Sequence, residues 1–337
     1  MKYILKIAIC FAVLVYMGVY LCNWFLGQSI KKEVATESSQ ALVSESSAQS
    51  ESSEASVIPP STASKEASAA ISQPIKETKF RLSKDKVKQG DLLVLIGENV
   101  EALPVAQSLL MENIKAYKDE NGLMLALIPI KYTHNPGSYY VSVSLDGVKT
   151  DLPVEVLKTD FPVVDIEVDD EVKEETIESK TANDEYMTKV QPLKAVNRDK
   201  VLWQGKFMPP LKEYRITSEF GEIRTVNGAP SDRHGGLDMA APAGTPVYAT
   251  NDGEVLFAEK IQLTGNTIMI EHGLGLKSHY YHMDSLNVKA GDMVKKGDLI
   301  GTVGTTGFST GPHLHFAVSV GRGYFNPQFV LDEEIGQ

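Results

Sequence analysis

The segment His313-Leu314-His315 places two imidazole side chains two residues apart, within a glycine-rich stretch that begins at Gly304. In an extended strand, side chains two residues apart point to the same face, so both imidazoles are expected to face one point. Neutral imidazole is the commonest metal ligand in proteins. The pair therefore predicts half of a metal site, although two ordinary strand histidines would give the same pattern.

The segment His234-Gly235-Gly236-Leu237-Asp238 adds an imidazole and a carboxylate four residues apart. The two glycines allow the backbone to bend so that both side chains can face one point. A zinc ion held by two histidines and one aspartate keeps a fourth position open for water, which is typical of catalytic rather than structural sites. Such an ion lowers the pKa of water in that position to about 7. Taken alone, the spacing arises by chance in many proteins.

Six of the seven histidines fall in the last third of the chain, more than a satisfied protein core needs. The sequence around them is typical of short strands separated by glycine-rich turns, which favours an open groove with loop walls. We expect strands at 214–220, 246–250, 253–258, 265–271, 276–282, 298–303 and 312–320.

Several further motifs accompany these histidines. They are Arg233–Val247, Asp252–Val255, Gly265–Ile268, Tyr281–Met283, Val294–Asp298 and Gly304–Phe316. In combination, the region from about Leu211 to Leu331 resembles the lysostaphin or LytM-type zinc metalloendopeptidases, which cut peptide cross-links of bacterial peptidoglycan. Less specifically, Trp203–Phe207 and the β-rich region before it resemble the N-terminal regions of some longer members.

The resemblance implies roles for five residues. His234, Asp238 and His315 match the three zinc ligands of that family. His282 and His313 match two histidines that orient the water or transfer its proton. Because the sequence has no glutamate base of the HExxH kind, an imidazole must accept that proton or stabilise the oxyanion. All five residues are present, so the resemblance implies an active zinc metalloendopeptidase whose substrate is peptidoglycan peptide.

The remaining residues near these motifs receive weaker interpretations. His272 precedes a glycine-rich hairpin turn and is interpreted as structural or facing solvent. His279 receives the same interpretation, because three residues before His282 in a strand it would point to the opposite face. Asn266 and Arg224 are expected in loops that line the groove, where they are candidates for substrate contact.

The N-terminus predicts a membrane anchor within residues 1–35. The run 7–26 carries no charged residue and is long enough to cross a bilayer. A cleavable signal peptide or a lipoprotein signal at Cys22 is a less favoured alternative. Lys2 and Lys6 before the run predict a single-pass cell-membrane protein with a cytoplasmic N-terminus and the bulk of the chain outside. The only cysteines, Cys10 and Cys22, lie in this region, so the rest of the chain offers no thiolate ligand.

Three further regions precede the peptidase domain, which we assign to 203–337. Residues 36–77 are rich in Ser, Ala and Glu and are expected to form a disordered linker. Residues 78–158 are expected to form a small immunoglobulin-like β domain, because Asn121-Gly122 and Asp146-Gly147 separate alternating apolar runs. Residues 159–202 are expected to form an acidic helical connector; a metal-binding acidic patch is the less favoured alternative.

The net charge of -11 and the lack of a dense Lys/Arg cluster argue against nucleic-acid binding. Two other functions compete with the enzyme, a catalytically silent regulator and a carrier domain. Some relatives of the peptidases keep the fold without metal ligands and activate a separate cell-wall amidase, but this chain retains every ligand. A biotinyl or lipoyl carrier would match Asp252–Val255 and the repeated Val-Lys-x-Gly-Asp motif, yet the modifiable lysine in its Met-Lys-Met-like setting is missing. The sequence does not indicate an oligomeric state.

Overall fold

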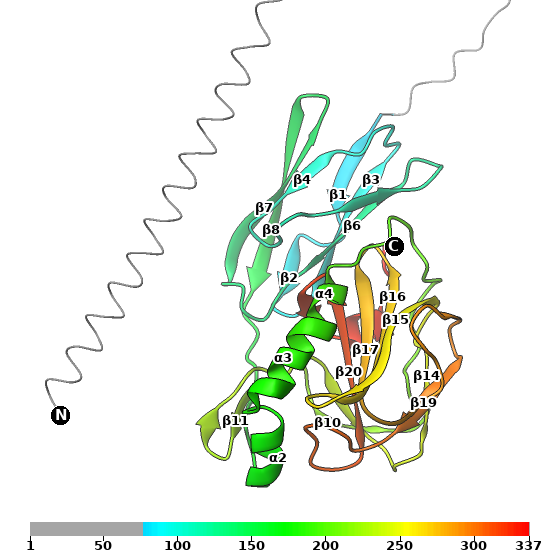
Figure 1. Cartoon of the computed structure of the whole chain (residues 1–337). Coiled ribbons are helices and arrows are strands. Elements are labelled where there is room, and N and C mark those ends of the chain that lie inside the picture. The colour runs from blue at the N-terminus through cyan, green and yellow to red at the C-terminus, as the bar shows by residue number, and fades with distance from the viewer. Residues whose placement is uncertain (1–76, 337) are drawn as a thin grey trace, which may run out of the picture. The chain divides into compact units, whose positions relative to one another are not determined.

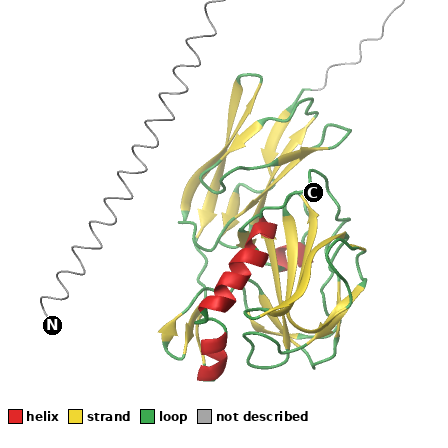
Figure 2. Ribbon diagram, viewed as in Figure 1, coloured by secondary structure: helices red, strands yellow, loops and turns green. Residues whose placement is uncertain are grey.

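The computed structural model describes residues 77–336, all of which belong to one compact unit, Ser72–Gln337. The predicted membrane span at 7–26 and nearly all of the predicted linker lie outside the described residues. Among the residues that are described, no helix is long and apolar enough to cross a bilayer. Strands dominate and the helices are short (Figure 1; Figure 2), which confirms the mainly β fold class.

The first half of the described chain forms two four-stranded sheets. One sheet has the order β1 (Lys79–Leu82), β3 (Leu92–Glu98), β6 (Met124–Pro129) and β5 (Ala116–Lys118). The other has the order β2 (Lys86–Lys88), β8 (Val148–Leu157), β7 (Gly137–Leu145) and β4 (Val105–Gln107). Side chains from both sheets, including Leu93, Leu95, Val141 and Val156, share one buried core. Two packed sheets agree with the expected β domain, whose immunoglobulin-like topology stays a prediction.

Both predicted hairpins of these sheets are present. β5 pairs with β6 around Asn121-Gly122, and β7 pairs with β8 around Asp146-Gly147. Asp146 and Gly147 have φ angles of 49° and 78°, the left-handed values that a two-residue type I′ turn requires. Turn chemistry at two residues therefore sets the register of the longest strand pair in these sheets.

Strand β3 is apolar on both faces because each face meets a different core. Leu93 and Leu95 point into the core between the two sheets. Leu92, Val94 and Ile96 point the other way and join the core of the C-terminal region. A near-continuous apolar run is the pattern expected of a strand buried on both sides.

The C-terminal region is built on one large sheet (Figure 1). Its strand order is β10 (Arg215–Ser218), β13 (Leu237–Ala240), β20 (His313–Val320), β17 (Leu276–Leu286), β16 (Gly265–Gly273), β15 (Gly253–Ile261) and β18 (Met293–Val294). Further strands at its margins are β14 (Pro246–Tyr248), β19 (Leu299–Val303) and β21 (Gly323–Phe325), and the short helix α5 (Gln328–Asp332) follows them. Its central strands are antiparallel. Because β17 and β20 are neighbours in this sheet, histidines that are distant in the sequence lie on adjacent strands.

The connector contains helices, as predicted, but it is not one solvated helix. It begins with strand β9 (Val163–Ile166), which pairs in parallel with β11 (Ile223–Val226); β11 also pairs with β12 (Ala229–Pro230). Three short helices follow: α2 (Asp170–Glu175), α3 (Lys180–Lys189) and α4 (Gln191–Lys194). Helix α3 and the segment after it pack on the main sheet through an apolar cluster that includes Val190 and Phe257. Strand β9 was not predicted, because helical composition does not reveal a four-residue strand whose partner lies some 60 residues away in the sequence.

A buried ion pair fixes the end of the connector to the main sheet. Lys277 Nζ lies 2.8 Å from Glu271 Oε2, and both side chains are fully buried. Lys277 also donates to the Val196 carbonyl at 2.5 Å, and Glu271 Oε1 accepts from the Arg198 amide at 3.3 Å. Buried charges are tolerated only when such additional hydrogen bonds satisfy them. The connector backbone supplies these bonds and so forms part of the same folded unit.

The repeated motif Val-Lys-x-Gly-Asp forms the same turn at each of its three positions. In each turn, the aspartate carboxylate accepts from the amide of the motif lysine, at 2.7, 3.0 and 2.7 Å for Asp91, Asp292 and Asp298. The glycine before each aspartate has a φ angle of 90° to 100°, which favours glycine. The motif is therefore a repeated turn, as predicted, and not a duplicated domain.

His272 is structural, as predicted, and makes folding stability depend on pH. Its buried ring donates from Nδ1 to the Asp252 carbonyl at 2.7 Å and accepts the Ser278 hydroxyl at Nε2 at 2.7 Å. Burial lowers the pKa of His272 to about 4. Between pH 6.5 and 4 the unfolded chain therefore binds one more proton at this residue, and stability falls as the pH falls through that window.

We expect replacement of His272 by glutamine to flatten this part of the stability curve. The free energy of unfolding of the original chain should fall more than that of His272→Gln between pH 6.5 and pH 4. The difference should be on the order of 3 kcal/mol, since one pKa unit corresponds to about 1.4 kcal/mol. Urea denaturation of both proteins with a chelator present measures it without interference from metal. Parallel curves for the two proteins would contradict the prediction.

Candidate active site

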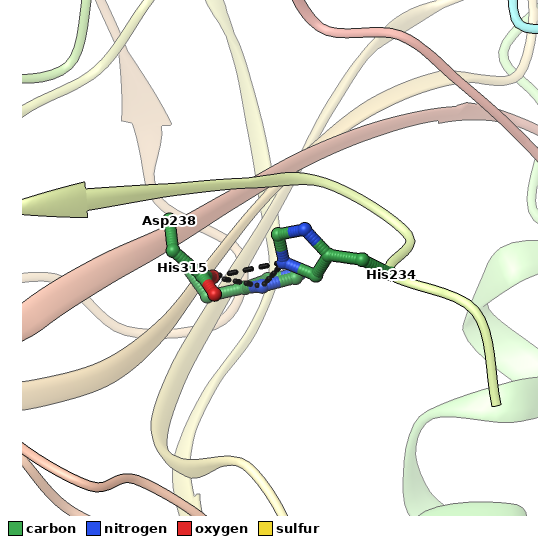
Figure 3. A group of neighbouring side chains, drawn as sticks. All are labelled: His234, Asp238 and His315. Atoms are coloured by element: carbon green, nitrogen blue, oxygen red, sulfur yellow. Dashed lines mark hydrogen bonds and ion pairs between the residues drawn. The ribbon is translucent and has the colours of Figure 1, made fainter. Parts of the chain in front are cut away.

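The structure brings the three predicted metal ligands together (Figure 3). Asp238 and His315 lie directly opposite each other on the antiparallel pair β13 and β20, so their side chains share one face. His234 precedes β13 and reaches the same point, with Nε2 at 2.9 Å from both Asp238 Oδ1 and His315 Nδ1. Asp238 Oδ1 and His315 Nδ1 lie 2.8 Å apart. Within residues 77–336, this is the one group of three potential ligands whose donor atoms converge.

Gly236 allows the close approach of the segment that carries His234 and Asp238. A Cβ atom at this position would collide with the Phe316 carbonyl oxygen and lie 2.8 Å from His315 Nε2. No side chain fits there unless β20 moves. The glycine predicted to let the backbone bend is therefore required by the space between two strands.

Hydrogen bonds prepare the three side chains as metal ligands. His234 Nδ1 lies 2.7 Å from the Glu219 carbonyl, so this nitrogen carries the proton and Nε2 presents a lone pair. Burial lowers the pKa of His315 to about 4, which leaves its ring neutral at pH 7. Burial by itself raises the pKa of Asp238, but the adjoining His234 and His315 rings hold that pKa well below its ordinary value. Two neutral imidazoles and one carboxylate fit a divalent zinc ion.

Arg224 forms an ion pair with the second oxygen of the Asp238 carboxylate. Its Nη2 lies 2.8 Å from Asp238 Oδ2, whereas the two histidines lie against Oδ1. Arg224 Nε in turn lies 3.6 Å from the buried carboxylate of Glu222. The residue was expected in a loop that lines the groove; it does line the groove, but it lies in strand β11 and contacts a predicted ligand. This pairing leaves only Oδ1 of Asp238 facing the converging nitrogens.

His282 and His313 lie beside this group with one nitrogen each available. His282 Nδ1 is 2.9 Å from the Thr306 carbonyl, and His313 Nδ1 is 2.8 Å from the Gly311 carbonyl. Because a carbonyl can only accept, both Nδ1 atoms carry protons, which leaves Nε2 of each ring as the nitrogen available to reacting groups. The ring centroids lie 4.8 Å apart. Burial lowers the pKa of His282 to about 3, so this ring is neutral at pH 7.

Residues 232–327 match the family model "Peptidase family M23", and this stretch contains all five residues. The chain contains an M23 peptidase domain. The finding confirms the resemblance to the lysostaphin and LytM-type enzymes.

Relatives of the M23 domain include peptidoglycan enzymes. Over 115 residues the chain is 46% identical to peptidoglycan DD-endopeptidase ShyB of Vibrio cholerae, covering 33% of this chain and 27% of ShyB. It is 34% identical to the catalytic domain of lysostaphin from Staphylococcus simulans, over 36% of this chain and 93% of that structure, with a TM-score of 0.33. The chain spans about a third or less of the length of the first curated relatives it matches.

A solved structure assigned to peptidase M23 from Pseudomonas aeruginosa matches beyond the M23 domain. It covers 72% of this chain and 93% of that structure, with 23% identity and a TM-score of 0.53. At this identity the likeness concerns the fold alone. The β-rich region before the M23 domain therefore belongs to an arrangement of strands that is also found elsewhere.

Tyr281 is a site residue that sequence reasoning missed. It lies directly opposite His315 on the paired strands β17 and β20, and the two rings stack with centroids 5.2 Å apart and planes inclined by 4°. The Tyr281 hydroxyl lies 3.4 Å from both His279 Nδ1 and the Tyr324 hydroxyl. The available signal was its position directly before His282 in the sequence. If the strand with His282 pairs with the strand that carries His315, Tyr281 can lie against that predicted ligand.

His279 corrects the prediction made from strand alternation. It pairs with Ala317, so it lies on the same face as Tyr281 and His315 and not on a face opposite to the site. It is fully buried, and its Nε2 lies 2.9 Å from the Ser319 hydroxyl. Alternation failed because His282 has a φ angle of 64°, which turns its side chain back toward that face. The structural interpretation of His279 is right, and the alternative of a solvent-facing side chain is wrong.

The M23 site opens into a hollow of about 370 Å³. Its lining residues are Ile166, Thr217, Ser218, Arg224, Asp238, Ala240, His282, Phe308, Ser309, Thr310, Gly311, Pro312, His313 and His315. Asn266, predicted as a substrate contact, is not among them. Its amide donates to the Met283 and Asp284 carbonyls at 3.0 and 2.8 Å, so it stabilises an irregular point in the pairing of β16 with β17.

A second hollow, of about 660 Å³, borders the first and has an acidic lining. It includes Asp165, Glu167, Asp169 and Asp170, together with Ser309 and Thr310, which line both hollows. These carboxylates are not among the described groups whose donor atoms converge on one point. The acidic run therefore borders the groove, and the less favoured reading of a metal-binding patch gains no support.

Proposed function

We propose that the chain is a zinc-dependent endopeptidase that hydrolyses peptide bonds in peptidoglycan. The observation that carries this proposal is the convergence of His234 Nε2, Asp238 Oδ1 and His315 Nδ1 within 4.8 Å of one another, next to two imidazoles with available Nε2 atoms. The M23 match and the peptidoglycan DD-endopeptidase relatives supply the substrate class.

The side chains of the groove can perform the proton transfers of hydrolysis. A zinc ion held by His234, Asp238 and His315 would supply Lewis-acid activation of a water molecule and of the scissile carbonyl. His282 enters the reaction neutral, and Nε2 of His282 or of His313 can take part in moving a proton from the water to the leaving amine. Their Nδ1 protons are held by backbone carbonyls, which fixes the orientation of both rings before substrate binds.

The alternative is a catalytically silent M23 domain that activates a separate amidase. Loss of ligands is the sequence mark of that class, and this chain retains all of its predicted ligands. The preparation of both Nε2 atoms for proton transfer also favours an enzyme, since a regulator has no need of it.

Digestion of purified peptidoglycan tests the proposed function directly. The purified chain, supplied with zinc, is expected to release soluble muropeptides, and mass spectrometry of the products identifies the bond that is cut. Peptide cleavage gives fragments with new amino and carboxyl termini. Release by cleavage of glycan or of the amide link to the glycan, or no release at all, would contradict the proposal.

Arg224 is expected to strengthen zinc binding by holding Asp238. Replacement by methionine keeps the length of the side chain and removes the bond to Oδ2, so zinc affinity should fall about 10- to 100-fold. Chelator competition measures this affinity. Arg215→Met, which changes an exposed arginine of strand β10 next to the Asp238 strand β13, is the matched control and should leave affinity unchanged. Equal affinities of Arg224→Met and the original chain would contradict the expected effect.

We further propose that residues 1–35 anchor the enzyme in the cell membrane, with the N-terminus in the cytoplasm and the groove outside. The support is the uncharged apolar run at 7–26 and the lysines before it. Protease added to intact spheroplasts should degrade the C-terminal domain. Protection of that domain, or release of the chain by high salt alone, would contradict the anchor.

A further inference from the structure

Ile166 of the connector is held at a fixed position beside the groove. It ends strand β9 opposite Val226 of β11, and its carbonyl accepts the Asn227 amide at 2.9 Å. The Asn227 side chain also bonds both backbone groups of Val168, at 2.9 Å each. The strand end is therefore bound on both sides of Ile166, and the backbone that carries its side chain is fixed.

The same residue lines the hollow that contains the predicted ligands, although it lies 66 residues before the stretch 232–327 that matches the M23 model. The neighbouring hollow places the flanking residues Asp165 and Glu167 against the same loop residues, Ser309 and Thr310. Two separate hollows thus place the end of β9 across from the 308–312 loop. The groove has a wall that the matched domain does not supply.

This wall differs in chemistry from the rest of the groove. Ile166 and Phe308 are the large apolar residues of the lining, and the remaining large side chains there are charged, imidazole or ring-constrained proline. Ile166 is only partly buried, so a substrate group placed against it would remove further apolar surface from water. A hollow of about 370 Å³ that also holds the reacting bond leaves room for a short side chain.

We propose that Ile166 is a specificity-determining residue that contacts a short apolar side chain of the substrate peptide, of the size of an alanine methyl group. This inference rests on the proposed function and adds to it a chemical class for one substrate position, a short apolar side chain. Contact with a methyl group contributes equally to ground-state and transition-state binding, so its loss should raise KM and leave kcat nearly unchanged.

The experiment combines changes in the enzyme with changes in the substrate. The full chain and its Ile166→Ala and Ile166→Leu variants are supplied with zinc and assayed on a soluble cross-linked dimer of alanine-containing stem peptides. A set of dimers carries glycine in place of each alanine in turn. Val163→Ala is the matched control, because Val163 lies on the same strand, is 71% exposed and does not line the hollow.

For Ile166→Ala we expect KM to rise about 5- to 10-fold with kcat within about twofold. Ile166→Leu should restore most of the affinity, and Val163→Ala should have no effect. One glycine-containing dimer should bind the original chain more weakly than the alanine dimer does. The same two dimers should bind Ile166→Ala equally well. Such non-additivity identifies the methyl group that meets Ile166.

The outcomes separate this inference from the proposed function. Cleavage by the original chain with unchanged kinetics in Ile166→Ala overturns the inference alone. A fall in kcat at constant KM also overturns it, because Ile166 would then act by holding β11 and Arg224. If no dimer is cleaved, the proposed function fails, and calorimetry of dimer binding then tests the inference by itself. Equal binding by the original chain and Ile166→Ala, including no binding by either, rejects the inference as well.

Discussion

Alanine in place of His282 or His313 is expected to reduce kcat on peptidoglycan peptides at least about 100-fold while zinc stays bound. General acid and base groups contribute about 10²- to 10⁴-fold to such reactions. Each ring is held at Nδ1 by a backbone carbonyl and keeps Nε2 for the reacting groups. Neither is among the three residues whose donor atoms converge, so its loss should leave those ligands in place.

Metal analysis and steady-state kinetics on the same protein samples measure this expectation. His134→Ala is the control, since His134 lies in a turn between β6 and β7 and outside the groove. Loss of zinc together with activity would show that the substituted histidine is a ligand and not a proton-transfer group. Retention of the original kcat in both variants would remove these residues from the mechanism.

Replacement of Asp238 by alanine is expected to weaken zinc binding at least about 1,000-fold and to abolish hydrolysis. Substitution of a supporting residue typically costs 10- to 100-fold in affinity, and loss of a direct ligand should cost more. The variant also leaves Arg224, whose side chain is 15% exposed, without its 2.8 Å partner. With only the Glu222 carboxylate at 3.6 Å left beside it, the Arg224 cation would then oppose the binding of a second cation by the two remaining imidazoles.

Asp238→Asn separates the loss of charge from the loss of a ligand oxygen. It keeps an oxygen at the site but no longer neutralises Arg224, so its zinc affinity should lie between those of Asp238→Ala and the original chain. Asp284→Ala, which removes an exposed carboxylate from the strand that carries His282, is the control. Zinc content and activity at the original level in Asp238→Ala would refute the assignment of ligands.

Local chemistry explains what could be predicted before the structure. The hairpin at Asp146-Gly147 and the three Val-Lys-x-Gly-Asp turns depend on φ angles and hydrogen bonds within a few residues, so their sequences specify them. The spacing of His234 and Asp238, and of His313 and His315, reports which side chains can share a face. The family resemblance that these motifs carry then implied His315 as the third of the three side chains that the structure brings together.

Predictions failed where a distant segment or a single backbone angle decided the outcome. His279 was placed on the wrong face because one left-handed residue, His282, interrupts the alternation of β17. Tyr281 was missed because its importance comes from pairing with His315, 34 residues later. Arg224 was a candidate for substrate contact and does line the groove, but only the fold places it against Asp238.

The sequence by itself determined the residue types of the predicted metal site, its turns and its class of fold, because residue type, spacing and backbone preference act over a few positions. Only the tertiary structure decided how those atoms are supported and what surrounds them. Strand β9 joins β11, Arg224 reaches Asp238 and Ile166 reaches the groove through pairings between segments roughly 14 to 140 residues apart. Such pairings depend on the combined burial and hydrogen bonding of whole sheets, which no short stretch of residues encodes.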